Sequence, residues 1–387
     1  MATLHDVLQT HVDNGALPGA VAIVADRNGM EEAAVGFAHA GDTVPMTPDS
    51  IFRLASLTKP ITAAALLMLV DDGQVGLHDP VDRWLPELAH PKVLRTPASP
   101  IDDVVPADRP ITVFDLLSSH AGYGFASDFD LPVMHALFTV QKDGREPQSF
   151  PPVDEWMAAL GAIPLLSQPG TAWLYDTCSA IQGVLIARAS GHSLPDFLSE
   201  RIFEPLGMTD TGFTVPKSER HRFTSYYRQG EDGLKLADGP NGQWSTPPAF
   251  PLGSGGLAGT AGDWLRFGEM LLAEGVSTDG HRLLSTESIA LMTTDHTTPA
   301  SRKFGELFLD GQGWGFGGSV DIAPIDAWNV PGRYGWVGGT GTSAHIVPST
   351  GSIAILLTQV GADSPVPDPW IRDFWSYPTT LEGPTAG

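Results

Sequence analysis

A serine, a lysine and a proline follow one another in the segment Ser56-x-x-Lys59-Pro60, directly before the apolar run 61–70. Because proline fits only the first turn of a helix, the sequence predicts a helix that begins near Ser56. Lys59 then lies one turn along the same face, where its amine can reach the Ser56 hydroxyl. A lysine kept neutral by burial could take the serine proton, and free N–H groups at the helix start could hold an oxyanion. The alternative is a capping serine beside a solvated lysine.

Tyr175 is a second candidate for proton transfer. It belongs to the turn 169–177, which leads into a helix expected to start near Ser179. A phenol at the junction of a loop and a helix can project into a cleft and act as a base beside an ammonium group. The alternative interpretation is a tyrosine that fills the gap between two helices.

The segment Tyr334–Thr342 contains four glycines and comes just before an expected strand around His345. Glycines at a strand edge let a ligand approach the backbone closely. A backbone N–H of this segment could therefore pair with that of Ser56 to form an oxyanion hole. A plain hairpin turn is the alternative.

Other chemistries find less support in the sequence. The 12 histidines form no H-E-x-x-H pair and Cys178 is the single cysteine, so we expect no catalytic metal. No segment is typical of a phosphate or dinucleotide cofactor site, so we expect no cofactor. His120 is the best imidazole for a conventional Ser-His pair, although a histidine that orders a loop is the commoner case. Ser254 lies in Leu252-Gly-Ser-Gly-Gly256, which lacks the G-x-S-x-G pattern of a nucleophile elbow.

The elements that must position these residues come from both ends of the chain. Short apolar runs predict strands, and the middle of the chain reads as helices divided by loops rich in proline and glycine. The expected strands are 19–25, 32–38, 314–321, 343–347 and 352–360, and the expected helices are 3–14, 61–70, 113–119, 153–160, 180–189, 194–202 and 263–272. Residues 91–110 read as loop, and the last dozen residues read as a frayed tail. The sequence predicts one α/β unit with a helical insertion.

Charge and hydropathy narrow the range of partners. The chain of 387 residues has 22 Lys+Arg and 45 Asp+Glu, a net charge of −23, which opposes binding to nucleic acid. Its longest apolar stretch, 61–70, is about half of the ~20 residues that a membrane span needs, so we expect no membrane span. The N-terminus does not read as a secretion signal, and one cysteine permits no intrachain disulfide, so we expect a cytoplasmic location.

Taken in order, Ser56-x-x-Lys59, Tyr175 and Trp336-Val-Gly338-Gly339 resemble the three motifs of the serine β-lactamase and penicillin-binding protein superfamily. The resemblance covers most of the chain and is greatest to class C-type enzymes and family VIII carboxylesterases. It implies an α/β fold with an antiparallel sheet flanked by helices, built from residues 1–75 and 255–387, and a mostly α-helical domain inserted at 76–254. The active site would lie between them.

The resemblance also implies roles. Ser56 would be the acylated nucleophile, Lys59 and Tyr175 would share its proton, and the backbone N–H groups of Ser56 and Gly339 would hold the oxyanion. Which of Lys59 and Tyr175 is the base stays open, because coupled groups titrate as a pair.

Two departures from the family pattern bear on the substrate. The chain has Trp336 where β-lactamases and carboxypeptidases usually present the lysine of K-T-G, and Tyr175-Asp176-Thr177 where Tyr-x-Asn is common. An indole offers an apolar face and no positive charge, so we expect neutral, partly hydrophobic esters. We expect Trp336, Gly338 and Tyr123 to contact the substrate, and further pocket candidates are Trp244, Trp314 and Trp328.

The sequence thus predicts a serine carboxylesterase acting on a small-molecule ester, with acyl transfer to alcohols as a further activity. The same nucleophile would also serve a β-lactamase, a D-amino-acid peptidase or an amide hydrolase. A binding protein without turnover is the alternative from a different class. The sequence does not indicate the oligomeric state.

Overall fold

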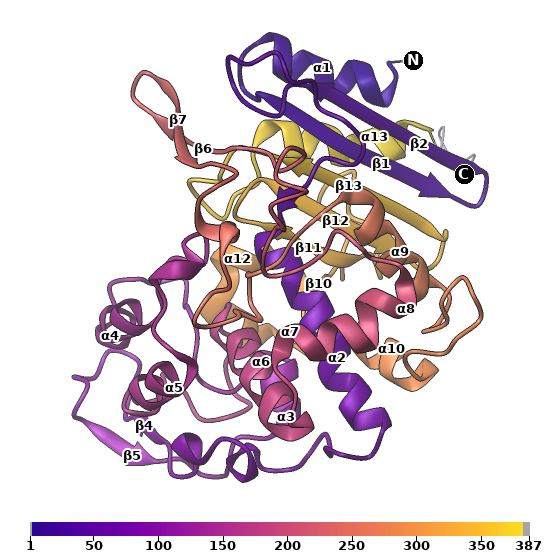
Figure 1. The fold of residues 1–387 in the computed structure, drawn as a ribbon. Coiled ribbons are helices and arrows are strands. Elements are labelled where there is room, and N and C mark those ends of the chain that lie inside the picture. The colour runs from indigo at the N-terminus through magenta and orange to yellow at the C-terminus, as the bar shows by residue number, and fades with distance from the viewer. Residues whose placement is uncertain (1, 382–387) are drawn as a thin grey trace.

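A seven-stranded antiparallel sheet forms one side of the molecule in the computed structural model, which describes residues 2–381 (Figure 1). Its strand order is β2-β1-β13-β12-β11-β10-β9, so the first two strands of the chain pair with the last five. These strands are β1 (Gly19–Asp26), β2 (Gly29–Gly36), β9 (Gly313–Trp314), β10 (Ser319–Val320), β11 (Tyr334–Gly338), β12 (Thr342–Val347) and β13 (Ser352–Thr358). The prediction of a sheet flanked by helices is confirmed.

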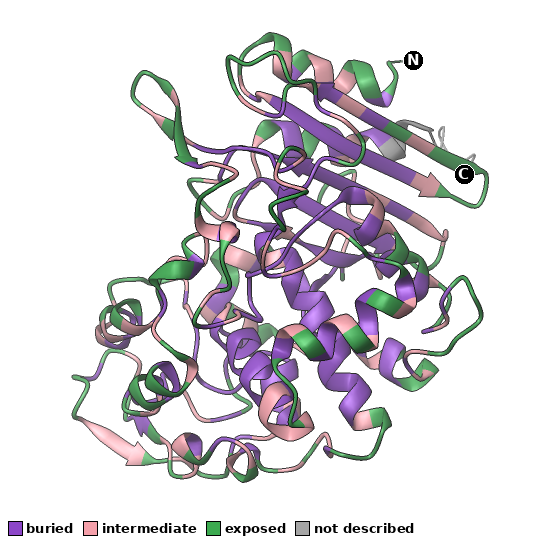
Figure 2. Cartoon of the chain, viewed as in Figure 1, coloured by how far each residue is buried: buried purple, intermediate pink, exposed green. Residues whose placement is uncertain are grey.

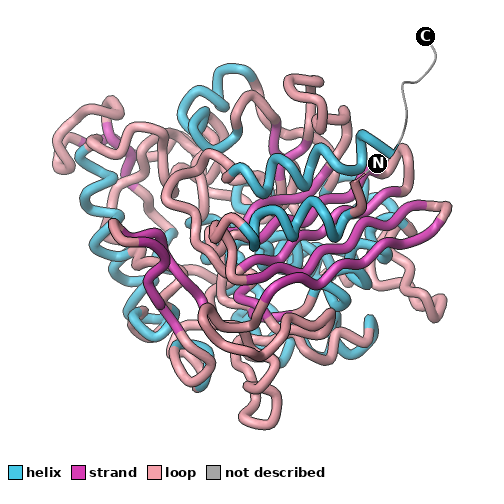
Figure 3. The backbone as a smooth tube through the Cα atoms, turned by 90° about the horizontal axis from the view of Figure 1, so that it is seen from above, coloured by secondary structure: helices cyan, strands magenta, loops and turns pink. Residues whose placement is uncertain are grey.

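Helices cover both faces of this sheet. On one face, α1 (Leu4–Asp13) and α13 (Pro369–Leu381) pack side by side against β1, β2 and β13, as the view from above shows (Figure 3). On the other face, α9 (Ala261–Leu272) packs against β1, β12 and β13. Side chains of β1 alternate between the two layers: Val21 and Ile23 join the large core, whereas Ala20 and Ala22 join the core under α1. Six of the eight residues of β1 are therefore buried.

The helical part of the chain is built around α2 (Thr58–Asp71) and α6 (Thr177–Ser190), which pack against each other. Both helices are buried almost all round at the centre of the molecule (Figure 2). The remaining helices are α3 (Val113–Leu117), α4 (Pro132–Val140), α5 (Val153–Gly161), α7 (Leu194–Leu198), α8 (Glu204–Leu206), α10 (Thr286–Met292), α11 (Pro299–Arg302) and α12 (Glu306–Leu309). The domain boundaries at 76 and 254 stay a prediction.

Three small two-stranded sheets lie outside the large one. They pair β3 (Phe52–Arg53) with β8 (Ala258–Gly259), β4 (Lys92–Leu94) with β5 (Val104–Pro106), and β6 (Tyr226–Gly230) with β7 (Gly233–Asp238). The interpretation of 91–110 as pure loop is therefore wrong, and the β6–β7 hairpin was not expected. Their strands are too short or too exposed to show a clear alternation of apolar residues.

Three further expectations need correction. The strand expected at 314–321 is interrupted by a turn in which the Gly315 N–H donates to the Gly318 carbonyl, which leaves β9 and β10. The glycine-rich segment that starts at Tyr334 is itself a strand, β11, followed by the turn into β12. Of the expected frayed tail, residues 376–381 belong to α13, and 382–387 lie outside the described residues.

Candidate active site

Ser56 lies at the start of α2, in a 3₁₀ turn that spans Ala55–Leu57. The helix can continue through Pro60 because this proline lies in the first turn, where backbone N–H groups have no partner within the helix. Ala55, just before Ser56, has a left-handed φ of 45°, a conformation that costs free energy in a residue with a Cβ. Ser56 is only half-buried and lines a cleft of about 660 Å³. The start of the helix therefore presents its hydroxyl to an open space.

Lys59 lies beneath Ser56 and makes three close contacts. Its Nζ is 2.8 Å from Ser56 Oγ, 2.6 Å from an Asp176 carboxylate oxygen and 2.7 Å from the Ser254 carbonyl oxygen. The side chain is fully buried. Burial by itself would lower the pKa of Lys59, but the Asp176 carboxylate and Tyr175 outweigh it and raise the pKa above its ordinary value. The direction of this shift and the ion pair with Asp176 favour the ammonium form of Lys59, in contrast to the neutral amine expected from burial alone.

Asp176 is the residue that keeps Lys59 charged. Its backbone forms a γ-turn, with φ 77° and ψ −61° and a hydrogen bond from the Thr177 N–H to the Tyr175 carbonyl of 3.1 Å. This strained turn directs one carboxylate oxygen to Lys59, while the other accepts a hydrogen bond of 2.8 Å from Gln141. The sequence showed Asp176 only as a departure from a motif. The expected burial of Lys59 could have indicated Asp176, because a fully buried lysine needs a negatively charged partner.

Tyr175 also contacts Ser56. Its hydroxyl lies 2.9 Å from Ser56 Oγ, and its ring lies with its centroid 4.8 Å from Lys59 Nζ. Two backbone hydrogen bonds with Phe125, of 2.9 and 3.0 Å, fix the segment that carries it just before α6. The structure therefore brings Ser56, Lys59 and Tyr175 together, although Tyr175 is 119 positions from Ser56 in the chain.

Trp336 on β11 holds Tyr175 in place. Its indole N–H donates a hydrogen bond of 2.8 Å to the Tyr175 hydroxyl, and its ring packs edge-on against Trp314 with centroids 4.8 Å apart. The indole is only 6% exposed and is absent from the lining of the Ser56 cleft. Trp336 thus contacts Tyr175, whereas the sequence led us to expect that it contacts the substrate.

Gly339 lines the same cleft as Ser56. Thr340 donates through its hydroxyl to the Arg53 carbonyl at 2.6 Å, and Thr342 donates to the Leu54 carbonyl at 3.0 Å. These two bonds tie the turn after β11 to the segment that leads into Ser56. A Cβ on Gly339 would meet open space, so its backbone borders the cleft. The geometry is compatible with the expected oxyanion hole, whose role stays a prediction.

Two expected substrate contacts are not in this cleft. Gly338 is buried, and a Cβ there would lie 2.6 Å from the Leu54 carbonyl oxygen, so this glycine allows close packing of β11. Tyr123 is 3% exposed, and its hydroxyl donates to the Ile163 carbonyl at 3.2 Å. Burial raises the pKa of the Tyr123 phenol. The expectation that either residue lines the substrate cleft is wrong.

The other pocket candidates also lie elsewhere. Trp244 and Trp314 are each 1% exposed and belong to the core, and Trp328 borders a separate cavity near α13. Single aromatic residues in loops rich in glycine and proline can pack inward as well as outward, so their sequence context did not separate the two cases.

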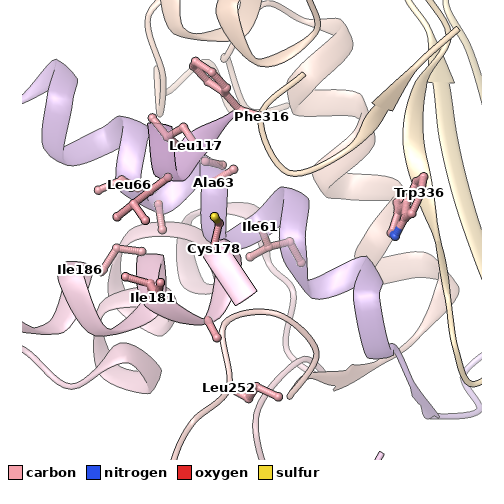
Figure 4. Close-up of a cluster of buried hydrophobic side chains, with 14 of the residues drawn as sticks. Ile61, Ala63, Leu66, Leu117, Cys178, Ile181, Ile186, Leu252, Phe316 and Trp336 are labelled. Carbon is pink, nitrogen blue, oxygen red and sulfur yellow. The ribbon is translucent and has the colours of Figure 1, made fainter. Parts of the chain in front are cut away.

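His120 and Cys178 do not line the Ser56 cleft. His120 is buried, and its ring nitrogens contact the Ser118 carbonyl and the Ser301 hydroxyl, so it orders a loop. Cys178 packs among apolar side chains of α2 and α6, including Ile61 and Ile181 (Figure 4). Burial raises the pKa of its thiol to about 12, so it is not a thiolate at neutral pH.

The described residues, 2–381, also bear on metals and membranes. Within them, no cluster of His, Cys, Asp or Glu side chains could hold a metal ion. Nor does any helix in that range have the length and apolar character that a membrane crossing requires.

Comparisons with known proteins identify the family of this chain. The sequence model of the family described as Beta-lactamase matches residues 4–373. A protein of Mycobacterium tuberculosis is 37% identical over 356 residues, covering 90% of this chain and 87% of that protein. Esterase EstB of Burkholderia gladioli is 31% identical over 380 residues, covering 92% of this chain and 90% of the esterase.

A solved structure shares the fold. It is described as EstCE1, a hydrolase with promiscuous acyltransferase activity, and superimposes with a TM-score of 0.79 at 23% identity, covering 96% of each chain. The family match spans nearly the whole chain, and the esterase relative exceeds 30% identity over most of it. The chain therefore belongs to the Beta-lactamase family and is a serine hydrolase of that superfamily.

Proposed function

We propose that this protein is a carboxylesterase that hydrolyses neutral, partly hydrophobic esters through an acyl-enzyme on Ser56. One observation carries the proposal: the Ser56 hydroxyl borders an open cleft and touches both Lys59 Nζ and the Tyr175 hydroxyl. Such an arrangement supplies a nucleophile, a proton carrier and a fixed positive charge within one hydrogen-bonded cluster. The likeness to esterase EstB supports ester hydrolysis in particular.

In the first half-reaction, Tyr175 takes the Ser56 proton as Ser56 Oγ attacks the ester carbonyl carbon. Lys59 is held as an ammonium by Asp176, so it is not free to accept that proton. For this step Tyr175 first releases its own hydroxyl proton to water in the cleft, and the Trp336 N–H and the Lys59 charge stabilise the phenolate that remains. The N–H groups of Ser56 and Gly339 hold the oxyanion. Collapse of the intermediate breaks the ester C–O bond, and Tyr175 returns the proton to the leaving alcohol.

In the second half-reaction, Tyr175 takes a proton from water, whose oxygen attacks the acyl carbon. The bond to Ser56 Oγ breaks, the proton returns to Ser56, and a carboxylic acid leaves. An alcohol that replaces this water would yield a new ester, so acyl transfer to alcohols is part of the proposal. The EstCE1 structure, described as a hydrolase with promiscuous acyltransferase activity, is consistent with that step.

The preference for neutral esters rests on the charges around the nucleophile. Trp336 replaces the lysine expected in K-T-G, and Lys59 is already paired with Asp176. Arg145, at the rim of the cleft, forms an ion pair with Asp143. Trp336, Lys59 and Arg145 therefore provide no unpaired cation for a substrate carboxylate, and Lys142, an exposed lysine that also lines the cleft, is a further positive charge that a substrate would meet. The cytoplasmic location expected from the sequence belongs to the same proposal.

The experiment compares wild type with Ser56→Ala on p-nitrophenyl butyrate and on nitrocefin. We expect ester hydrolysis to fall by at least ~10³-fold, because the nucleophile is removed. Ser218→Ala, a substitution of an exposed serine outside the cleft, is the control and should match wild type. Labelling of wild type, but not of Ser56→Ala, by a fluorophosphonate probe would locate the acylated atom.

Three results would contradict the proposal. Equal ester hydrolysis by wild type and Ser56→Ala would remove Ser56 from the reaction. A large preference of wild type for nitrocefin would favour a β-lactamase or amide hydrolase of the same superfamily, and absence of both turnover and labelling would favour a binding protein.

A further inference from the structure

Four phenylalanines form one side of the Ser56 cleft, and together with Tyr175 we call them the aromatic wall: Phe125, Phe129, Phe138 and Phe308. They come from three separate parts of the chain, namely the segment before α4, α4 itself and α12. Their rings are in contact: the Phe125 and Phe138 rings stack with centroids 5.2 Å apart, and Phe129 lies 5.9 Å from Phe138 and 6.2 Å from Phe308. This cluster was not expected from the sequence, because Tyr175 and Phe308 are remote in the chain from the other three phenylalanines.

The aromatic wall begins at the reacting groups. The Phe308 ring stacks on the Tyr175 ring with centroids 4.7 Å apart and planes 26° from parallel. The hydroxyl of the same tyrosine is 2.9 Å from Ser56 Oγ. A substituent of an ester whose carbonyl carbon lies at Ser56 therefore reaches this wall within a few bonds. The wall and the nucleophile belong to one cleft.

The outer part of the wall is exposed to an unusual degree for phenylalanine. Phe129 is 38% exposed and Phe138 is 46% exposed, whereas the large aromatic side chains of the core are almost fully buried. Apolar surface in water costs free energy in proportion to its area, and a contiguous exposed patch indicates a binding surface. Within the described residues, 2–381, the exposed faces of these rings border the open cleft. The occupant is therefore a group that shares the cleft with the ester bond.

We propose that the aromatic wall binds an aromatic substituent of the substrate, so that the preferred esters are those with an aryl ring a few bonds from the carbonyl carbon. This inference rests on the proposed esterase function. Rings favour offset stacked or edge-to-face contacts with other rings beyond what their area explains. The wall presents ring faces and edges in both arrangements. An aryl group thus gains more here than a saturated ring of equal size.

The test uses two pairs of esters that differ only in aromaticity and contain no other ring. Methyl phenylacetate is compared with methyl cyclohexylacetate, which places the ring on the acyl side. Benzyl acetate is compared with cyclohexylmethyl acetate, which places it on the alcohol side. Proton release gives kcat/KM for each ester. We expect wild type to prefer the aryl ester in at least one pair by roughly 3- to 10-fold.

Phe129→Leu and Phe138→Leu remove ring contacts at positions that are partly exposed, so the fold should tolerate them. We expect each variant to lose most of the aryl preference in the affected pair. Phe37→Leu is the matched control, because Phe37 is 43% exposed and does not line the cleft, and it should keep the wild-type ratio.

The outcomes separate this inference from the proposed function. Hydrolysis of the aryl and cyclohexyl esters at equal rates in both pairs would contradict the proposed role of the aromatic wall and would not affect the esterase proposal. An aryl preference that survives in both Leu variants would also overturn it. If wild type cleaves none of the four esters but turns over nitrocefin, the esterase proposal fails, and this inference with it.

Discussion

The surroundings of the Ser56 hydroxyl differ on its two sides: one side is buried and charged, and the other is open and aromatic. Beneath it, Lys59 is fully buried and bonded to Asp176 and to the Ser254 carbonyl. In front of it, the aromatic wall is open, and Phe138 is nearly half exposed. The buried side fixes charges and proton positions before any substrate arrives, whereas the open side gains its contacts only when one binds. Under the two proposals, reactivity depends on the buried side and selectivity on the four phenylalanines, with Tyr175 belonging to both, so substitutions on the two sides should have different effects.

Lys59→Met removes the charge at the centre of the buried side and should have the largest effect. We expect kcat/KM on p-nitrophenyl butyrate to fall by at least ~10²-fold, because the proton transfer loses its electrostatic support. The free energy of unfolding should fall by about 3 kcal/mol, since the Asp176 carboxylate loses its ion-pair partner. Urea denaturation measures this loss. Lys92→Met, at an exposed position, should change neither quantity, and retention of activity within tenfold in Lys59→Met would separate Lys59 from the reaction.

Asp176→Asn tests whether the carboxylate keeps Lys59 charged. Burial lowers the pKa of Lys59 and Asp176 raises it, so the pKa should fall when the carboxylate is replaced. Activity that needs the ammonium is then lost at lower pH, and the basic limb of the kcat/KM profile moves to lower pH. In wild type the folded-state pKa lies above the ordinary 10.5, so the stabilising ion pair persists through the neutral range and is lost only as the pH rises through that higher value.

The rate of Asp176→Asn near pH 7 should fall by about tenfold, which is a smaller loss than in Lys59→Met. Asp72→Asn provides the control, because it breaks an exposed ion pair with Arg201 at the far end of α2. A basic limb at the same pH in Asp176→Asn and wild type would show that Asp176 does not govern Lys59.

Trp336→Phe keeps an aromatic ring but removes the hydrogen bond to the Tyr175 hydroxyl. A hydrogen bond of this kind contributes about 0.5–1.5 kcal/mol, so we expect kcat/KM to fall by about 3- to 10-fold. The matched control is Trp314→Phe, since the Trp314 N–H has no hydrogen-bond partner in the part of the chain that the structure describes. Equal rate losses in the two variants would indicate a packing effect and would remove the special role of the Trp336 N–H.

Tyr123→Phe should have the smallest effect, because Tyr123 lies on neither side of the cleft. Loss of its hydrogen bond to the Ile163 carbonyl should lower the free energy of unfolding by about 1 kcal/mol. The values of kcat and KM for p-nitrophenyl butyrate should stay those of wild type. A changed KM would restore the original expectation that Tyr123 contacts the substrate.

Local sequence determined the reactive segment and much of the fold. Pro60 sets the start of α2, and the three-residue spacing then places Lys59 on the face of Ser56, as the structure confirms. The apolar runs at both ends of the chain indicated the sheet, because alternation and short length are properties of each strand by itself. Strands of two residues, such as β3 and β8, have no such pattern and were found only in the structure.

Tertiary structure alone decided the charge of Lys59 and the shape of the cleft. Asp176 lies 117 positions from Lys59, and only the γ-turn before α6 directs its carboxylate to the amine. The rings of Phe129 and Phe308 are likewise brought into contact by the fold. A sequence pattern predicts only those contacts that residues make with their neighbours in the chain. The pKa of a buried group and the wall of a cleft depend on distances between segments that are remote in sequence.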